Sequence, residues 1–201
     1  MELKLNKTND YLTAVFNQPN FLSDEVINDV LLNSKYRQEG EELWDGPTSS
    51  PFSSSKLNSR ICKIYELHNP AELVKHILNF INQLNNNCYK FNLIGIPSFD
   101  VPSRVEYQSV VGGKFDQHTD IGPGHLSTRK ISFSIQLSSE DDYEGGDLTF
   151  YPNYRSPEEI VSYRRKGTLI IFPSYRSHSV TPVTKGIRNS IVGWVHGDAF
   201  V

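Results

Sequence analysis

The sequence has few cysteines, no long hydrophobic run and no large excess of charge of either sign. Its two cysteines, Cys62 and Cys88, are too few for a disulfide framework or a metal-binding knuckle, which favours a reducing compartment. No apolar run reaches the roughly 18 residues of a membrane-spanning helix, and the first residues lack the apolar stretch of a secretory signal. The net charge of −3 argues against broad electrostatic binding of nucleic acid or anionic lipid. We therefore expect a cytoplasmic protein that binds neither nucleic acid nor membrane.

The remaining composition is that of a globular protein with many turns. Of the 201 residues, 37% are hydrophobic and 21% are charged, and there are 11 prolines and 13 glycines. A chain of this length buries about two thirds of its unfolded surface, so it needs no disulfide or metal to hold together. We expect a single domain over 1–201, with a helical flank and a long loop in 1–90 and a β-rich core in 91–201.

Two segments of the first half have the periodicity of amphipathic helices. Residues 22–32 offer Ser23 as an N-cap, followed by acids and then by apolar residues at helical spacing. Residues 70–86 repeat apolar side chains with a 3.6-residue period, and Asn69–Pro70 suits the N-cap and N1 positions. The stretch 39–56 between them is rich in Gly, Ser, Pro and acids, which predicts a long surface loop.

From residue 89 onward, short β-branched and aromatic runs alternate with turn signals. The expected strands lie at 91–96, 104–111, 131–137, 148–151, 160–164, 168–172, 179–183 and 190–195. Residues 131–137 alternate strictly, with apolar side chains at the odd positions and polar ones at the even positions. Short strands at this spacing predict an antiparallel sandwich or barrel, with the helices packed on one face of the sheet.

A His-x-Asp motif follows the expected strand that contains Phe115. In extended backbone, residues two apart point to the same side, so His118 and Asp120 can converge on one ion. His178, at the start of a later strand, can supply a third ligand. Two histidines and a carboxylate leave three coordination positions open, an arrangement typical of non-haem Fe(II) oxygenases. The motif alone is weak, because a His-x-Asp arises by chance in roughly a quarter to a third of such sequences.

Arg188 follows shortly after His178 and can serve the same site. An oxygenase with a 2-oxoacid co-substrate needs a cation for the carboxylate that does not bind the metal. The planar fork of arginine suits a carboxylate better than a point charge does. A surface salt bridge is the alternative for an isolated arginine.

Many residues between 104 and 197 form a pattern that is more specific than these four residues. They are Tyr107, Gly112, Phe115, His118 and Asp120; Arg129 and Ser132; Leu137–Ser138 and the segment 142–148, Asp-Tyr-Glu-Gly-Gly-Asp-Leu; Lys166–Gly167 and Phe172–Pro173; His178, Val180, Pro182–Val183, Gly186 and Arg188; and Trp194. In this order they resemble the catalytic domain of the 2-oxoglutarate- and Fe(II)-dependent dioxygenases, in the prolyl 4-hydroxylase-like branch. The segment 141–148 is especially similar to bacterial members of the procollagen-lysine/prolyl hydroxylase type.

The resemblance implies a fold and a catalytic set. The fold is a double-stranded β-helix, a cupin-like jelly-roll barrel of mainly β structure, with the N-terminal helices on one face and with 91–201 as its catalytic core. The implied ligands of Fe(II) are His118, Asp120 and His178. Arg188 matches the residue that binds the distal carboxylate of 2-oxoglutarate.

Further residues match the walls of the co-substrate pocket. Tyr107 matches a tyrosine that hydrogen-bonds 2-oxoglutarate, although its spacing to the first ligand varies among relatives. The other matching positions are Leu148, Val180 and Trp194. Gln136 stands where some relatives have a second carboxylate-binding tyrosine, so this contact is expected to be weaker here or to come from elsewhere.

The implied activity is hydroxylation of a C–H bond, with O2 and 2-oxoglutarate converted to succinate and CO2, and with ascorbate as an additional candidate cofactor. By resemblance, the substrate is a prolyl residue of a peptide or protein. Two alternatives stay open: hydroxylation of a free amino acid or small metabolite, and a non-catalytic cupin-like protein that binds a metal or ligand. The triad together with Arg188 argues against the second. The sequence carries no indication of the oligomeric state.

Several other residues have a structural interpretation beside a functional one. Gly145–Gly146 lacks the Lys-Ser/Thr and the helix of a phosphate loop, so it indicates a tight turn between strands. His125, in the insertion 121–128 after the metal motif, is expected to be an exposed loop histidine, with gating of the site as the alternative. Trp44, within the loop 40–60, is equally compatible with a lid over the barrel mouth and with packing against the core.

Overall fold

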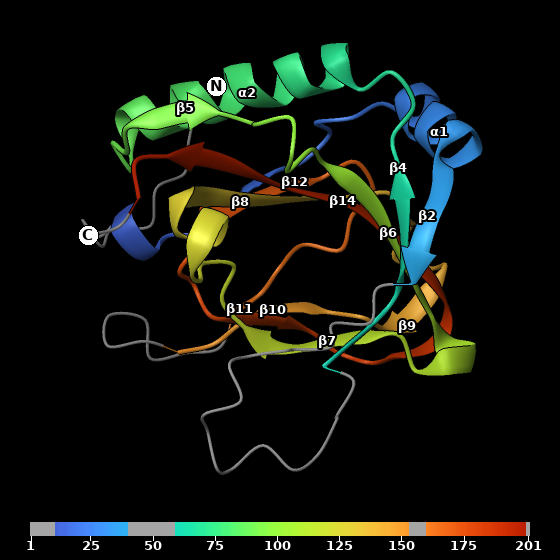
Figure 1. Cartoon of the computed structure of the whole chain (residues 1–201). Helices are drawn as coiled ribbons and strands as arrows, with labels where there is room; N and C mark the ends of the chain where they lie inside the picture. Colours follow the sequence, from blue (N-terminus) through green and yellow to red (C-terminus); the bar gives the residue numbers. More distant parts are fainter. Residues whose placement is uncertain (1–10, 40–58, 153–159, 200–201) are drawn as a thin grey trace.

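The computed structural model describes residues 11–39, 59–152 and 160–199, which build two antiparallel sheets that face each other (Figure 1). The larger sheet has the order β1 (Phe16–Gln18), β12 (Leu169–Pro173), β8 (Arg129–Gln136), β14 (Val183–Gly197), β6 (Ser103–Gln108), β4 (Lys63–Glu66) and β2 (Lys35–Glu39), and β5 (Leu93–Gly95) and β9 (Tyr143–Gly145) also pair with β14. The smaller sheet has the order β11 (Ile160–Val161), β10 (Leu148–Phe150), β13 (His178–Val180), β7 (Lys114–His118) and β3 (Arg60–Ile61). The predicted antiparallel sandwich or barrel is therefore confirmed.

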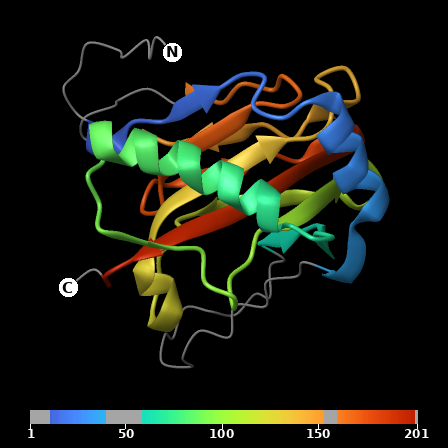
Figure 2. The same ribbon diagram turned by 90° about the horizontal axis from the view of Figure 1, so that it is seen from above.

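The helices cover the outer face of the larger sheet, as Figure 2 shows from above. α1 (Asp24–Asn33) begins at the predicted cap, because the Ser23 hydroxyl accepts a hydrogen bond from the Val26 amide. The predicted cap of α2 (Ala71–Asn87) is wrong. Pro70 holds the N-cap position without a side-chain hydrogen bond, and Asn69 adopts φ +44° with its amide on the His68 ring. Among the described residues, no helix has the length and apolar character that crossing a membrane requires.

Buried side chains form two clusters on opposite faces of the larger sheet. One cluster lies between the helices and the sheet and contains Ile27, Ile77, Ile81, Leu84, Ile131, Phe133, Ile135 and Ile191, among others. The second lies between the two sheets and contains Val105, Tyr107, Leu148, Phe150, Ile170, Phe172, Val180 and others. The larger sheet is therefore buried on both faces, and the inner face is the one that holds polar groups.

All eight expected strands exist, with different ends. Residues 104–111 form β6 only to Gln108, followed by the 3₁₀ turn η2 (Ser109–Val111), and 190–195 is a part of the much longer β14. The first 90 residues are more than a helical flank, because they also supply β1 to β4. These strands contain two to five residues; β1, β2 and β3 lie at sheet edges, and β4 lies between β2 and β6. Most of the expected loop 39–56, with Trp44 and any lid, lies outside the described residues.

Candidate active site

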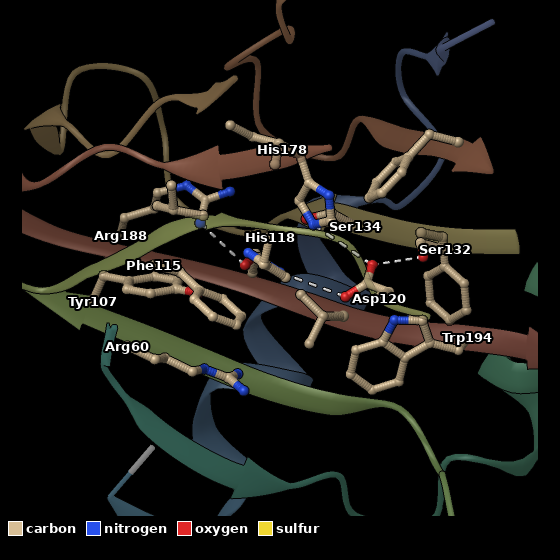
Figure 3. A pocket seen from close by; sticks show the side chains of 16 residues that line it. Arg60, Tyr107, Phe115, His118, Asp120, Ser132, Ser134, His178, Arg188 and Trp194 are labelled. Carbon is tan, nitrogen blue, oxygen red and sulfur yellow. Dashed lines mark hydrogen bonds and ion pairs between the residues drawn. The ribbon is translucent and has the colours of Figure 1, made fainter. Parts of the chain in front are cut away.

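The three predicted metal ligands converge between the two sheets (Figure 3). His118 ends β7, His178 begins β13, and the two residues are partners in the antiparallel ladder. Asp120 follows two residues after His118, and its carboxylate oxygens lie 3.5 Å from Nε2 of each histidine. The possible ligand atoms of all three residues lie within 4.8 Å of one another. Two imidazoles and one carboxylate at this spacing suit an Fe(II) ion with open coordination positions.

Backbone carbonyls orient both imidazoles. Nδ1 of His118 lies 2.8 Å from the carbonyl oxygen of Asp116, and Nδ1 of His178 lies 2.8 Å from that of Arg176. A carbonyl only accepts, so each Nδ1 carries the proton and each Nε2 presents a lone pair to the site. Burial also lowers the pKa of His178, although Asp120 opposes this effect. The neutral form that binds a metal is therefore the one that the fold favours.

Asp120 is buried and held from several sides. The Ser132 hydroxyl donates to its Oδ2 at 2.7 Å, and its amide donates to the carbonyl of Ser174 at 2.9 Å. Burial alone would raise the pKa of this carboxyl, but His178, His118 and the Ser132 hydrogen bond lower it well below its usual range. The Asp120 carboxylate is therefore ionised and fixed in place, which suits a divalent metal ion.

Arg188 lies deep in the same pocket and is 1% exposed. It donates to Gln136 Oε1 at 3.0 Å and to Ser190 Oγ at 3.4 Å, and its Nε has no hydrogen-bond partner within the part of the chain that the structure describes. Both of these partners are neutral and the side chain is buried, so Arg188 does not form the surface salt bridge that was its alternative interpretation. A buried cation with donors to spare fits an incoming carboxylate. Gln136, at the position that the resemblance singled out, accepts a hydrogen bond from this arginine.

A glycine turn leaves room for Arg188. Gly145 and Gly146 have φ values of +69° and +64°, as expected of the predicted tight turn. A Cβ at Gly146 would lie 3.0 Å from Cδ of Arg188, and one at Gly145 would lie 2.1 Å from the carbonyl oxygen of Pro182. Side chains at these positions would push the β9 end of the chain away from the arginine.

The predicted wall residues all line the pocket. Leu148, Val180 and Trp194 do so together with Tyr107. Tyr107 is the ladder partner of Arg188, and its ring centroid lies 5.5 Å from the guanidinium carbon. Burial raises the pKa of Tyr107 to about 12, so the hydroxyl keeps its proton as a donor at neutral pH.

Sequence reasoning assigned no role in the site to three contributors, although Phe115 and Ser132 belong to the pattern that carries the family resemblance. Phe115 stacks on His118 with ring centroids 3.6 Å apart, Ser132 bonds Asp120, and Arg60 lines the pocket from β3. Ser132 carried a signal, because it is a polar even position of the alternating strand. Arg60 carried none, since a two-residue strand has no recognisable pattern. His125 is exposed and does not line this pocket, which agrees with its interpretation as an exposed loop histidine.

Comparisons with known proteins agree with this geometry. The family model of the 2OG-Fe(II) oxygenase superfamily matches residues 104–196. A PKHD-type hydroxylase of Prochlorococcus marinus (strain NATL1A) is 35% identical over 168 residues, which are 81% of this chain and 70% of that protein. Another from Synechococcus sp. (strain CC9902) is 36% identical over 88 residues, 44% of this chain and 38% of the relative.

Solved structures of two prolyl hydroxylases share the fold. A prolyl-4-hydroxylase of Pseudomonas putida has a TM-score of 0.63 at 15% identity, covering 92% of this chain and 94% of its own. A prolyl hydroxylase from Trichoplax adhaerens, in complex with a hypoxia inducible factor peptide fragment, has a TM-score of 0.63 at 19% identity, covering 92% and 84%. The predicted double-stranded β-helix is thus confirmed. The chain belongs to the 2OG-Fe(II) oxygenase superfamily and is a 2-oxoglutarate-dependent dioxygenase that uses Fe(II) and O2.

Proposed function

We propose that this enzyme hydroxylates a prolyl residue of a peptide or protein. In this proposal His118, Asp120 and His178 hold Fe(II), and Arg188 holds the distal carboxylate of 2-oxoglutarate. The observation that carries it is the convergence of three ligand side chains and a buried, incompletely bonded arginine in one pocket. When bound, Fe(II) and 2-oxoglutarate supply the oxidising power, with O2 consumed and succinate and CO2 released.

The side chains of the protein position the reactants and exclude water. The carbonyls of Asp116 and Arg176 hold the two imidazoles as Nε2 ligands, and Ser132 holds the carboxylate. The Tyr107 hydroxyl keeps its proton and can donate a hydrogen bond to the same co-substrate carboxylate as Arg188. Apolar side chains shield this region from water; they include Leu148, Phe172 and Val180.

The prolyl substrate is favoured by the names of the relatives. The first structural neighbour is a prolyl-4-hydroxylase, and the second was solved with a peptide fragment. The curated relatives are PKHD-type hydroxylases. A free amino acid or another small metabolite is the competing substrate class. Stimulation by ascorbate and a cytoplasmic location stay predictions, as does the division of the chain at residue 90.

A titration followed by a product assay tests the proposal. We expect one Fe(II) per chain under anaerobic conditions, then 2-oxoglutarate binding, and succinate and hydroxyproline formation from proline-containing peptides in air. His118→Ala and His178→Ala should abolish tight iron binding, whereas His125→Ala, which changes an exposed histidine, should leave it intact. Near-stoichiometric iron in both ligand variants would contradict the metal assignment. Product from free amino acids alone would contradict the peptide substrate.

A further inference from the structure

Inward-facing side chains of β14 form a row that leads from the depth of the pocket toward its opening. Arg188, Ser190, Val192 and Trp194 occupy alternate positions of the strand, and all four line the pocket. Arg188 and Ser190 are buried, whereas Val192 and Trp194 are partly exposed. Figure 3 shows Arg188 and Trp194 at opposite ends of the pocket, with the three proposed metal ligands between them. The pocket therefore opens on the side of Trp194.

A network of ion pairs lies beside Trp194, at this open side. The Arg129 guanidinium carbon lies 3.5 Å from the centroid of the Trp194 ring, and Arg129 also donates to the carbonyl of Asp120 at 3.4 Å. The same guanidinium pairs with both carboxylate oxygens of Asp100, at 2.8 and 3.0 Å. Nε2 of His196, two positions after Trp194, lies 2.9 Å from Asp100 Oδ2. The network therefore holds the loop before β6 at the rim of the pocket, and its charges are paired within the protein.

Phe99, the neighbour of this aspartate in the loop, is 67% exposed. Its ring centroid lies 5.9 Å from that of His125 and 5.8 Å from that of His196, and the ring planes are nearly perpendicular, at 81° and 87°. Two further large apolar side chains of the same segment, Ile94 and Val101, are exposed as well. A single exposed apolar side chain is ordinary, but several in one segment beside a pocket are typical of a surface that binds a partner.

The distance between Phe99 and the metal position suits neighbouring residues of one peptide. Arg129 alone bridges the backbone of Asp120 and the side chain of Asp100, which is next to Phe99. An extended peptide advances about 3.3–3.6 Å per residue, so residues about two to four positions away from a proline at the metal can reach the Phe99 ring. A free amino acid is too short to contact both places.

We propose that the Phe99 ring binds apolar side chains that flank the target proline, and that the enzyme therefore selects an extended peptide with an apolar flank. This inference rests on the proposed function and deepens it, since it takes the metal site as assigned there and names the chemistry of the peptide. Aromatic rings contribute much of the binding free energy at protein interfaces, because they bury a large and rigid surface. The charges beside Phe99 already have partners, which favours an apolar flank over a charged one.

Peptides that differ only in their flanks test this inference. The apolar probe is N-acetyl-Leu-Leu-Ala-Pro-Ala-Leu-Leu-amide, the polar probe carries Asn in place of each Leu, and the short probe is N-acetyl-Ala-Pro-Ala-amide. Dissociation constants are measured by calorimetry without O2 on the protein loaded with Fe(II) and 2-oxoglutarate, and hydroxyproline and succinate are measured in air. We expect the wild type to bind the apolar probe about tenfold more tightly than the polar probe, because partial burial of one leucine contributes about 1.4 kcal/mol.

Variants of Phe99 separate substrate binding from a merely structural role. Phe99→Ala should lower the affinity for the apolar probe to that for the polar probe, whereas the short probe, which has no flank, should bind the variant and the wild type equally. Phe99→Tyr keeps the ring and should keep the preference. Tyr163→Ala is the matched control, because it removes another ring that is 60% exposed and does not line the pocket. The control should behave as wild type.

The outcomes distinguish this inference from the proposed function. Equal affinity of the wild type for the apolar and polar probes, or a preference that survives in Phe99→Ala, overturns the role of Phe99. A preference that is lost equally in Tyr163→Ala, or failure of the wild type to bind any of the three probes, overturns it as well. Hydroxyproline formed without regard to the flank overturns the role of Phe99 alone and leaves the prolyl reaction in place. Flank-selective binding without hydroxyproline supports Phe99 and instead contradicts the prolyl reaction.

Discussion

The guanidinium of Arg188 is buried with neutral partners, so its affinity for an anion depends on the charge itself. Arg188→Ala should leave iron binding nearly intact and weaken 2-oxoglutarate binding by about 3–5 kcal/mol, because a buried carboxylate then loses its partner. Arg188→Lys should fall between the two, since an ammonium lacks the fork. Anaerobic calorimetry with 2-oxoglutarate measures both. Arg164→Ala, which breaks a partly exposed pair with Asp147, is the control; equal affinity in Arg188→Ala and this control contradicts the clamp.

Ser132 holds the carboxylate ligand without touching the metal position. Ser132→Ala removes the 2.7 Å hydrogen bond to Asp120 Oδ2, which leaves the carboxylate free to rotate. We expect Fe(II) affinity to fall about 10- to 100-fold, in the range typical of such supporting groups. Ser134→Ala, two positions along the same strand, changes a hydroxyl that is not among the contacts of Asp120 and should change the affinity little. Competition with a chromophoric chelator measures both variants, and equal affinities would remove Ser132 from the metal site.

At the scale of single residues, sequence reasoning succeeded where a residue belongs to a local motif. Asp120 follows two residues after His118 at the end of β7, and His178 and Arg188 match the family pattern, so all four could be proposed in advance. The position of Arg60 in the pocket could not, because it depends on the ladder that places this residue opposite Phe115. A residue that acts through a partner far along the chain leaves no local trace.

Among the elements, β8 shows how much the alternation of apolar and polar residues along a strand predicts about burial. The predicted alternation is present, but nearly the whole strand is buried, so the polar face does not meet solvent. Ser132 and Ser134 line the pocket, and Gln136 bonds Arg188. Period-two patterning predicts two different faces, and only tertiary structure decides whether the polar one faces water or a ligand.

The C-terminal end of β14 is anchored by a buried histidine, which predicts a pH dependence of stability. Nε2 of His196 lies 2.9 Å from Asp100 Oδ2, and its Nδ1 lies 2.8 Å from Thr128 Oγ1, in the 3₁₀ turn η3 (Gly124–Thr128). Burial lowers the pKa of His196 although Asp100 raises it. The unfolded chain, with a histidine pKa of about 6.5, therefore takes up this proton first as the pH falls.

Stability due to the neutral imidazole is thus fully present above about pH 6.5 and is lost as the pH falls toward the lower pKa of the folded protein. The free energy of unfolding of the metal-free protein should decrease between pH 7.5 and 5.5, and this decrease should be smaller in His196→Gln. Urea denaturation at several pH values measures both slopes. His178 titrates in both proteins and cancels from the comparison. Identical slopes would exclude His196 as a source of the pH dependence.

At the scale of the whole molecule, the two buried clusters separate stability from the site. Ile77 of α2 is fully buried in the cluster under the helices, on the far side of the sheet from the pocket. Ile77→Ala should therefore destabilise the protein by about 2–5 kcal/mol and leave the Fe(II) and 2-oxoglutarate affinities of the folded fraction unchanged. Phe172→Ala removes a ring that packs edge-on against the His178 ring, with the ring centroids 4.7 Å apart. This change should lower both the stability and the ligand affinities. Denaturation and calorimetry on the two variants test this separation.

The fold class was predictable from the sequence, but the order in which the strands pair was not. The number and spacing of the short strands indicated an antiparallel barrel, and the family resemblance specified its type. The order of strands was not accessible, because β14 pairs with β6 and β8 from distant parts of the chain. The strands from the first 90 residues are too short and too polar to be recognised from their sequence pattern. Their position depends on the free hydrogen-bonding edge that the core sheets offer.

The register of β7 against β13 also sets when the protein can capture its metal. His118 and His178 are ladder partners. The neighbouring residues Gln117 and Ser177, which are joined by a hydrogen bond, are 60 positions apart in the sequence. In an unfolded chain, bringing such positions together requires closure of a long loop, at an entropic cost. With His118 and His178 as the proposed ligands, a newly synthesised chain binds its iron only after this long-range ladder has formed. The bound metal would then stabilise the folded barrel relative to the unfolded chain.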